Sequence, residues 1–439
     1  MRWILACVLI AAPGWAGLSR VAFSGFRAET NGLPAGWTIW APRPEIAPRT
    51  FVDPLHYRTR PGSLAISGNS NPAVFGGWEH PVAGIAPGQW YRFVAYYRAE
   101  GIRYESGQVL ARLVWTDAAA KRIGHPDFPY AVSPAGDWMR LSLDAPAPEG
   151  AAAVRIQLFL ANAPSGTLWW DDISLEPIPA PAPRRVTIAS IKFMPQGTHS
   201  AAESVDRFVA AVQRAVTVPA DVILLPEGIT VAGTGKSYVD VAEPVPGPTT
   251  ARLAELARGR KAYVVAGLYE REGTAVYNTA VLLGRSGELI GKYRKVHLPY
   301  TEIEAGLTPG DHYPVFETDF GKVGLMICWD SEFADPARAL ALEGAEIILL
   351  PIWGATEPLV KARAIENRVF VAQSCYSNPS FIVDPKGEVQ ALATEQGTAA
   401  IATVDLSRRY AWPALGVMRE RFPKELRLDV PMPRPGFGY

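Results

Sequence analysis

The chain has 439 residues, 48% of them hydrophobic and 20% charged, which is typical of a globular protein long enough for two domains. Lys and Arg together number 43, as do Asp and Glu, so the formal net charge is zero. Because no basic tract stands out, the sequence argues against nucleic acid and against an anionic membrane surface as partners.

The first 17 residues have the layout of a secretory signal peptide. Arg2 precedes an apolar run from Trp3 to Ala12, and the small residues Gly14 and Ala16 flank a cleavage point. The alternative is a buried N-terminal strand or helix. The run is too short to span a bilayer comfortably, and no later stretch is apolar enough for a membrane helix. We therefore expect an exported protein, periplasmic or extracellular, without a membrane span.

Cysteine is rare in this sequence. Of the three cysteines, Cys7 lies inside the predicted signal peptide, so Cys328 and Cys375 would remain. They could form one disulfide, but an exported domain that depended on disulfides would carry more of them. A thiol kept in an oxidising compartment therefore calls for a chemical reason.

Residues 18–176 are predicted to form an all-β domain, because short alternating runs are separated by turn signals. The runs lie at 91–99, 108–117, 138–145 and 153–161. This spacing indicates an antiparallel sandwich. Together with the closing segment TLWWDDISLEP (167–177), it resembles the jelly-roll sandwiches of carbohydrate-binding modules. The resemblance makes a polysaccharide a candidate partner through tryptophan stacking; the alternative is that the tryptophans fill the core.

The second half of the chain has a different pattern of apolar and polar residues. Residues 177–185 include PIPAPAP and are predicted to be a stiff extended linker. Over 186–409, helical and strand patterns alternate, beginning with a capping box at Ser200 and Glu203, and this alternation predicts an α/β layered domain. Residues 410–439 lack such patterns and are predicted to form an irregular C-terminal arm.

Reactive side chains accompany the predicted strands of this second half. Glu227 ends the apolar run in LLPEG, Lys295 lies in KYRKVHLP, and Cys328 ends the run in MICWD. The ends of apolar strands are where α/β folds place their sites. Each residue alone has a plainer interpretation, because a free cysteine is usually a small core residue. Together and in this order they predict a site for nucleophilic catalysis.

These motifs resemble those of the nitrilase superfamily of carbon–nitrogen hydrolases over residues 186–405. The resemblance implies a four-layer αββα sandwich that usually forms a homodimer, with Glu227, Lys295 and Cys328 as a catalytic triad. A second glutamate of that family precedes a segment like AGLTPGD; Glu304 is expected to be this residue, with Glu302 as the alternative. Neither a metal nor a cofactor is implied.

The resemblance also implies a mechanism. Glu227 would deprotonate Cys328, which would attack an amide carbonyl carbon and form a thioester. Lys295 and the backbone N–H of Trp329 would hold the oxyanion. His297 is interpreted as structural or on the substrate side rather than as the general base, and Cys375 as a core residue. Asn278 and the run ARAIEN (362–367) resemble further family positions, interpreted as structural.

Several alternatives stay open at this point. True nitrilases often show Cys-Trp-Glu, whereas residues 328–330 read Cys-Trp-Asp, which favours an amidase acting on small amides. A nitrile hydrolase or an acyltransferase of the same superfamily is the alternative within the enzyme class. From another class, the alternative is a glycan-binding protein whose C-terminal half has lost its activity.

Overall fold

The structure is a computed structural model that describes residues 19–430, in two compact units. One unit comprises the residues up to Pro181 together with those from Ala411 onward, and the other comprises Ala182–Tyr410. The predicted signal peptide, with Cys7, lies outside the described residues.

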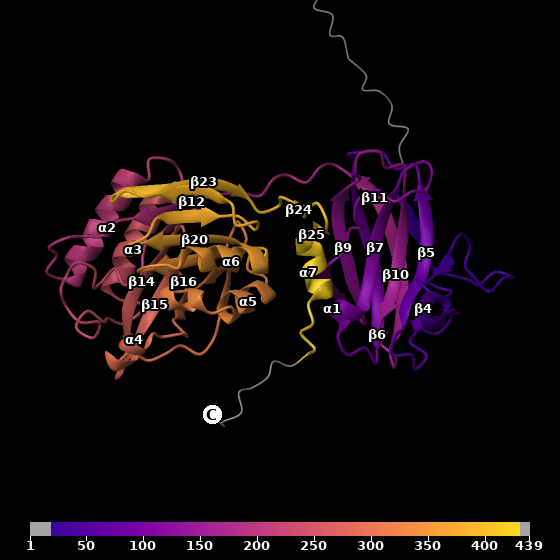
Figure 1. Ribbon diagram of the computed structural model, residues 1–439, viewed down its shortest axis with the longest axis horizontal. Helices are drawn as coiled ribbons and strands as arrows, with labels where there is room; N and C mark the ends of the chain where they lie inside the picture. Colours follow the sequence, from indigo (N-terminus) through magenta and orange to yellow (C-terminus); the bar gives the residue numbers. More distant parts are fainter. Residues whose placement is uncertain (1–18, 431–439) are drawn as a thin grey trace, which may run out of the picture. The chain divides into compact units, whose positions relative to one another are not determined.

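Two antiparallel sheets form most of the N-terminal unit (Figure 1). The larger sheet has the order β3-β4-β11-β6-β9-β8, with β1 paired to β11, and the smaller has the order β2-β5-β10-β7. The larger sheet contains β1 (Val21–Phe23), β3 (Arg49–Asp53), β4 (Ser63–Ser67), β6 (Trp90–Glu100), β8 (Ala131–Ala135), β9 (Trp138–Pro146) and β11 (Thr167–Ile178). The smaller contains β2 (Thr38–Trp40), β5 (Phe75–Ala83), β7 (Val109–Thr116) and β10 (Ala153–Ala161). Two short helices, η1 (Pro44–Ile46) and α1 (Glu105–Gln108), complete this part of the unit.

One apolar core lies between these two sheets. Strand β6 alternates buried and more exposed residues, as a strand with one buried face must, and its Phe93 packs into the core. Trp78, Trp115 and Trp170 are fully buried in the same core. For these three tryptophans the structural interpretation is therefore correct. The four predicted alternating runs all form strands, namely β6, β7, β9 and β10.

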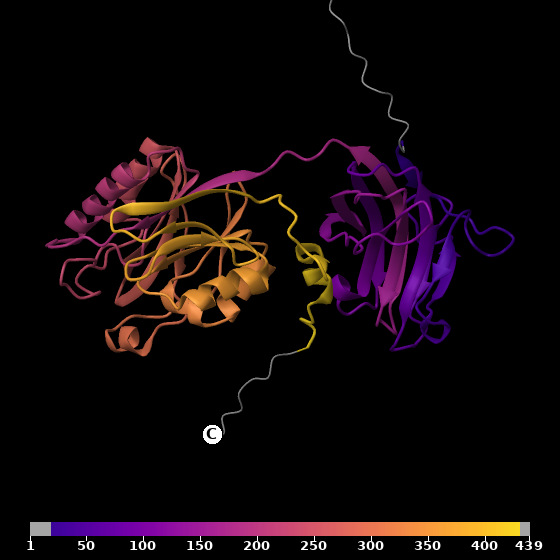
Figure 2. The same ribbon diagram turned by 45° about the horizontal axis from the view of Figure 1, so that its top comes forward.

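The C-terminal segment of the chain has more structure than its sequence pattern indicates. It forms a small hairpin of β24 (Ala411–Trp412) and β25 (Gly416–Val417), followed by helix α7 (Met418–Glu425). Helix α7 lies beside α1 and the strands of the N-terminal unit (Figures 1 and 2). The Tyr104 hydroxyl donates to the Leu426 carbonyl at 2.6 Å, and Lys424 Nζ donates to the Val109 carbonyl at 3.3 Å. These contacts come from residues far apart in the sequence, so local patterns do not reveal them.

The C-terminal unit contains two six-stranded sheets. The first has the order β16-β15-β14-β13-β12-β23 and the second the order β17-β18-β19-β20-β21-β22. The first contains β12 (Arg185–Lys192), β13 (Val222–Leu224), β14 (Tyr263–Glu272), β15 (Ala275–Leu283), β16 (Leu289–Arg294) and β23 (Thr398–Asp405). The second contains β17 (Val315–Glu317), β18 (Lys322–Leu325), β19 (Ile347–Ile352), β20 (Phe370–Cys375), β21 (Ser380–Val383) and β22 (Val389–Ala393). The helices are α2 (Ala201–Ala215), α3 (Pro248–Arg260), α4 (Tyr300–Glu304), η2 (Cys328–Glu332), α5 (Asp335–Leu342) and α6 (Glu357–Asn367).

Three apolar clusters arrange these elements in four layers. Helices α2 and α3 pack on the first sheet, where Phe208 and Leu253 meet Ile223. A second cluster, which includes Leu224 of the first sheet and Leu325 of the second, fills the space between the sheets. Helices α5 and α6 cover the outer face of the second sheet. The unit is therefore an αββα sandwich, as predicted. The strands are apolar on both faces because both faces are covered.

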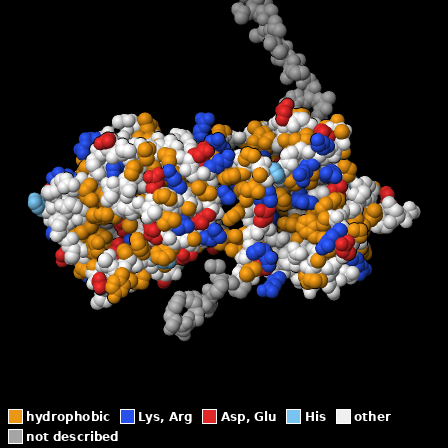
Figure 3. Space-filling view, viewed as in Figure 1, with side chains coloured by type: hydrophobic (Ala, Val, Ile, Leu, Met, Phe, Trp, Pro, Cys, Tyr) orange, Lys and Arg blue, Asp and Glu red, His pale blue; other side chains and the backbone are white. Residues whose placement is uncertain are grey.

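Within residues 19–430, no helix is both long and apolar enough to cross a membrane. On the face drawn in Figure 3, basic and acidic side chains are interspersed, without a large area of one sign.

Candidate active site

Glu227 lies three residues beyond β13, in a tightly packed turn. Its side chain is 2% exposed, and the hydroxyl of Tyr376 donates to its backbone carbonyl at 2.7 Å. The neighbouring strand β14 passes so close that a Cβ on Gly267 would lie 2.6 Å from the Glu227 Cα. Only glycine permits this approach. The turn therefore fixes Glu227 through its backbone and leaves the carboxylate to face the interior.

Lys295 follows β16 and is 1% exposed. Its Nζ lies 3.0 Å from Glu227 Oε1 and 2.8 Å from Glu302 Oε1. The side-chain amide of Asn278, on β15, donates to Glu227 Oε1 at 2.7 Å, and the Asn278 carbonyl accepts from the Lys295 N–H at 2.8 Å. The second oxygen of Glu227, Oε2, is buried and has no hydrogen-bond partner among the described residues. One buried ammonium thus bridges two carboxylates, one of which keeps a free oxygen.

The position of the second glutamate corrects the sequence-based expectation. Glu302, the alternative, is 7% exposed and contacts Lys295, whereas Glu304, the expected residue, is exposed to solvent. Both lie on the short helix α4. Two residues on a helix are separated by about 200°, so the two side chains point to opposite sides. The Glu302 side chain is the one that points into the protein interior.

Cys328 lies just beyond β18, at the first residue of η2. Its φ angle is 44°, in the left-handed region that non-glycine residues rarely occupy. Such a conformation at a sharp turn is common at functional sites, where the surrounding structure holds it. The thiol is partly accessible, with its Sγ 4.0 Å from the Gly354 carbonyl oxygen.

Charge and burial set the protonation of these groups. Burial raises the pKa of the Cys328 thiol well above its usual range, the Glu227 carboxylate raises it further, and Lys295 lowers it by a smaller amount. Burial alone would lower the pKa of Lys295, but Glu227, Cys328 and Glu302 together raise it above its usual value. Burial also raises the pKa of Glu302, against the opposing effect of Lys295. The resting site therefore holds a neutral thiol beside a lysine ammonium.

Asp330 connects the segment that carries Lys295 to the turn that carries Cys328. It is fully buried and accepts hydrogen bonds from the Ile327 N–H at 3.0 Å, the Tyr293 hydroxyl at 2.7 Å and the His297 N–H at 3.0 Å. In the sequence, Asp330 serves only to discriminate amidases from nitrilases, and the pattern does not reveal these three hydrogen bonds. Its place two residues after the cysteine was the available signal.

His297 and Trp329 lie at the edge of this arrangement. The His297 ring lies between two carboxylates, with Nδ1 3.2 Å from Asp330 and Nε2 3.3 Å from Asp335, and it stacks on Phe333. The hydrogen bond to Asp330 raises the pKa of His297. Both ring nitrogens are thus engaged with aspartates. The Trp329 side chain, 41% exposed, lies edge-on to Phe333.

Cys375 is a buried residue, as its sequence context indicates. Its Sγ lies 3.4 Å from the Trp353 carbonyl oxygen and accepts from the Asn378 N–H at 3.4 Å. Both described cysteines are free thiols. Within residues 19–430, no three His, Cys, Asp or Glu side chains are grouped so that they could hold a metal ion.

Known proteins resemble the part of the chain that carries Glu227, Lys295 and Cys328. The sequence profile of the carbon-nitrogen hydrolase family matches residues 187–414, and the chain belongs to this family of enzymes. A nitrilase from Pyrococcus abyssi is 37% identical over 188 residues, which cover 39% of this chain and 71% of that protein. Human omega-amidase NIT2 is 29% identical over 256 residues, which cover 52% of this chain and 91% of that protein.

Two solved structures are similar to part of this chain. An amidase from Nesterenkonia sp. aligns with 52% of this chain and 95% of its own, at 25% identity and a TM-score of 0.45. Nit3 of Saccharomyces cerevisiae, described as a member of branch 10 of the nitrilase superfamily, aligns with 56% of this chain and 95% of its own, at 24% identity and a TM-score of 0.47.

Proposed function

We propose that the chain is an amidase-type hydrolase of carbon–nitrogen bonds other than peptide bonds, with Cys328 as its nucleophile. The observation that carries the proposal is the pair of contacts from Lys295 Nζ to Glu227 and Glu302, which occupies one Glu227 oxygen and leaves the other free. A buried carboxylate oxygen without a donor is suited to accept a proton. Because the resting thiol is neutral, the mechanism needs such a base.

In the first half of the reaction, Glu227 takes the thiol proton as the Cys328 sulfur attacks the carbonyl carbon of the amide. Lys295 and the backbone N–H of Trp329 stabilise the oxyanion; one such donor is typically worth about 3 kcal/mol of the barrier. Glu227 then gives its proton to the departing nitrogen, which leaves as ammonia. The product on the enzyme is a thioester between Cys328 and the acyl group.

In the second half, Glu227 takes a proton from water as the water oxygen attacks the thioester carbon. The carbon–sulfur bond breaks, the acid leaves, and the proton returns to Cys328. Glu302 keeps Lys295 charged and oriented in both halves, because its carboxylate stabilises the ammonium. Asn278 and Asp330 are positioning residues that hold Glu227 and the cysteine turn.

Aromatic side chains around the nucleophile favour an uncharged acyl group. Trp329, Phe333 and Trp353 are large apolar residues that remain about two-fifths exposed. Trp353 packs at 4.6 Å against Tyr376, which binds the Glu227 backbone. The carboxylates of Glu227 and Glu302 outnumber the one Lys295 ammonium that they contact, so these three groups carry a net negative charge when all are ionised. A substrate that carries its own carboxylate would be repelled by these charges.

The remaining parts of the proposal concern export and the N-terminal unit. Export rests on the signal-like first 17 residues, and N-terminal sequencing of the mature protein tests it: a start near residue 18 supports cleavage. For the N-terminal sandwich we propose a jelly-roll, carbohydrate-binding role that holds the enzyme near a polysaccharide. A homodimer is proposed from the family resemblance alone, and sedimentation analysis tests it.

Ammonia release tests the reaction class. The mature protein would be given small amides, carbamoyl compounds and nitriles in parallel, with the Glu227→Gln variant as the comparison. The proposal predicts release from amides that falls at least 100-fold in Glu227→Gln. Release from nitriles alone would replace the amidase assignment with a nitrilase assignment.

A further inference from the structure

The outer face of the four-stranded sheet carries polar and aromatic side chains that the core does not use. Along β10, Leu158 faces the core, so its neighbours Gln157 and Phe159 face outward. The strand register places Trp40, Gly77 and Phe159 in one row across the sheet. The next row is Thr38, Glu79, Gln157 and Arg112. These two rows bring an aromatic strip and a polar strip side by side.

The aromatic strip surrounds one arginine. Trp40 stacks on Phe159 with 5.1 Å between ring centroids and 11° between planes. The Arg112 guanidinium carbon lies 4.9 Å from the Phe159 centroid, 5.4 Å from that of Trp40 and 5.9 Å from that of Phe75. Phe159 is fully buried although it faces outward, and Trp40 is the ring stacked over it. Trp40 itself stays partly exposed to solvent.

Several polar atoms of this face are buried and unused. Gln157 is 3% exposed and donates through Nε2 to Glu79, but its Oε1 has no partner. The Nε atoms of Arg112 and Arg155 are likewise buried without a partner. Buried polar atoms in native proteins are nearly always hydrogen-bonded, and each unsatisfied one costs about 1–3 kcal/mol. One acceptor and two donors on a single face indicate a ligand that supplies the complementary groups.

The charge of the face indicates the sign of that ligand. Burial lowers the pKa of Arg112, Glu79 raises it, and Arg122 and Arg155 lower it by smaller amounts, with a net pKa of about 10. Arg112 therefore stays protonated at neutral pH. Arg112, Arg122 and Arg155 interact on this face with a single carboxylate, that of Glu79, which lies 3.9 Å from Arg155 Nη1. The remaining local charge is positive and favours an anion.

We propose that this face binds an acidic saccharide, with the sugar ring on Trp40, its carboxylate at the Nε atoms of Arg112 and Arg155, and a hydroxyl donating to Gln157 Oε1. A uronic acid residue carries all three features: an apolar C–H face, a carboxylate and hydroxyl donors. A neutral sugar lacks the anion, and a simple carboxylate lacks the ring face. This inference rests on the proposed carbohydrate-binding role of the N-terminal unit and gives that role a location and a ligand class.

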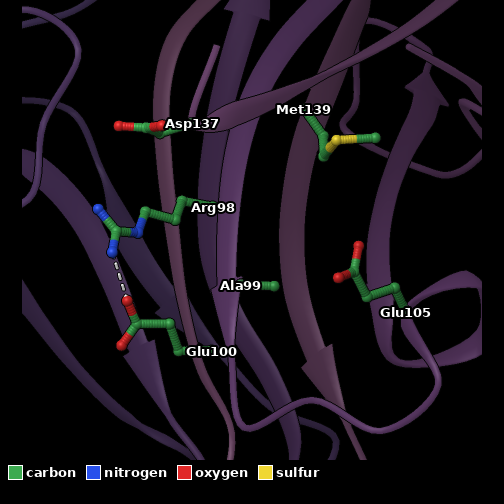
Figure 4. A pocket seen from close by; sticks show the side chains of 6 residues that line it. All are labelled: Arg98, Ala99, Glu100, Glu105, Asp137 and Met139. Atoms are coloured by element: carbon green, nitrogen blue, oxygen red, sulfur yellow. Dashed lines mark hydrogen bonds and ion pairs between the residues drawn. The ribbon is translucent and has the colours of Figure 1, made fainter. Parts of the chain in front are cut away.

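A cavity on the larger sheet of the same unit has the opposite character. Its volume is about 510 Å³, and it is lined by Arg98, Ala99, Glu100, Glu105, Asp137 and Met139 (Figure 4). Arg98 is already paired with Glu100, and the other charged groups are carboxylates. An acidic ligand would be repelled there. Arg98 also lies 5.8 Å from the ring centroid of Trp169, so it is a matched control for an arginine beside an aromatic ring.

Binding of the whole mature protein to polygalacturonate tests the proposal, with the fully methyl-esterified polymer as the matched uncharged ligand. We expect calorimetry to show binding to the acid form that is at least 10-fold tighter than to the ester. Arg112→Lys, which keeps the charge but removes Nε, and Trp40→Ala should each weaken binding by about 10-fold, the effect of one charge-assisted contact. Arg98→Gln should bind like the wild type.

Three results would overturn the proposal: equal binding of acid and ester, unchanged binding in both Arg112→Lys and Trp40→Ala, or no binding of polygalacturonate. The comparison of acid with ester uses the wild type alone, so it decides the question even if a variant fails to fold. Ammonia release measured on the same samples tests the hydrolase proposal separately from saccharide binding. Arg112→Lys, Trp40→Ala and Arg98→Gln lie outside the Glu-Lys-Cys site and should leave turnover unchanged.

Discussion

Replacing Glu302 by Gln removes one of the two carboxylates that contact the Lys295 ammonium. The Glu302 Oε1 atom lies 2.8 Å from Lys295 Nζ, and Glu227 Oε1 lies 3.0 Å from it. Removing one partner of a buried ion pair costs about 3–5 kcal/mol. Because Glu227 remains in contact, we expect the free energy of unfolding to fall by an amount near the lower limit, about 3 kcal/mol. Because Lys295 is then held less firmly as an oxyanion donor, kcat/KM should decrease by about 100-fold, the effect of losing one such donor.

The pH dependence distinguishes this electrostatic role from a general loss of folding. Glu302 is one of the groups that raise the pKa of Lys295. Without it that pKa falls, so Lys295 loses its proton at a lower pH and the alkaline limb of the kcat/KM profile moves to lower pH. A structural defect would lower the whole profile without moving the limb.

The assay is ammonia release from a small neutral amide, measured as kcat/KM over a range of pH for three proteins. Glu304→Gln is the matched control, because the same substitution on the same helix affects a solvent-exposed side chain. It should keep wild-type activity. Full activity in Glu302→Gln together with a loss in Glu304→Gln would refute the assignment of Glu302 as the partner of Lys295.

Three further predictions follow from the same geometry. An amide that carries a carboxylate, such as succinamate, should have a kcat/KM at least 10-fold below that of its uncharged analogue. Trp353→Ala should lower turnover of the uncharged amide. A preference for the charged amide would contradict the proposal that aromatic and acidic side chains surround the acyl group. Glu227→Gln should speed iodoacetamide labelling of Cys328 while it stops turnover. Glu227 raises the pKa of that thiol, so its removal leaves more thiolate. Peptide mapping measures the labelling rate, and slower labelling in the variant would contradict the prediction. Gly267→Ala should destabilise the protein by about 1–3 kcal/mol and lower its melting temperature, because the new Cβ would meet the Glu227 backbone. Gly259→Ala, in a helix with open space around it, should not destabilise the protein.

The sequence alone predicted the α/β layers of the C-terminal unit and named Glu227, Lys295 and Cys328 as candidate site residues. Glu227 and Cys328 follow apolar strands that are covered on both faces, and such strands are recognisable as continuous apolar runs. Lys295 was identified by its motif. The alternation of strand and helix patterns over this half of the chain predicted an α/β layered domain, and the resemblance to the nitrilase superfamily implied its four layers.

The choice between Glu302 and Glu304 could not be made in the same way. Helix α4 has five residues, too few to show a periodic pattern. Apolar side chains are usually buried and charged ones exposed, but here Ile303 is 49% exposed while Glu302 is buried. The buried charge is stabilised by Lys295, a tertiary contact that no local pattern shows. The structure of the C-terminal arm escaped prediction for a related reason, since it depends on contacts with residues such as Tyr104 and Val109, far away in the sequence.

The most direct test of the central claim is the trapping of the acyl-enzyme on Cys328. Wild type and Cys328→Ala would be mixed with a substrate amide, quenched in acid, and examined by intact-protein mass while ammonia is measured in the same samples. The account predicts an added acyl mass on the wild type that maps to Cys328, with ammonia release, and neither in Cys328→Ala. Ammonia release by Cys328→Ala at the wild-type rate would remove Cys328 as the nucleophile and contradict the mechanism.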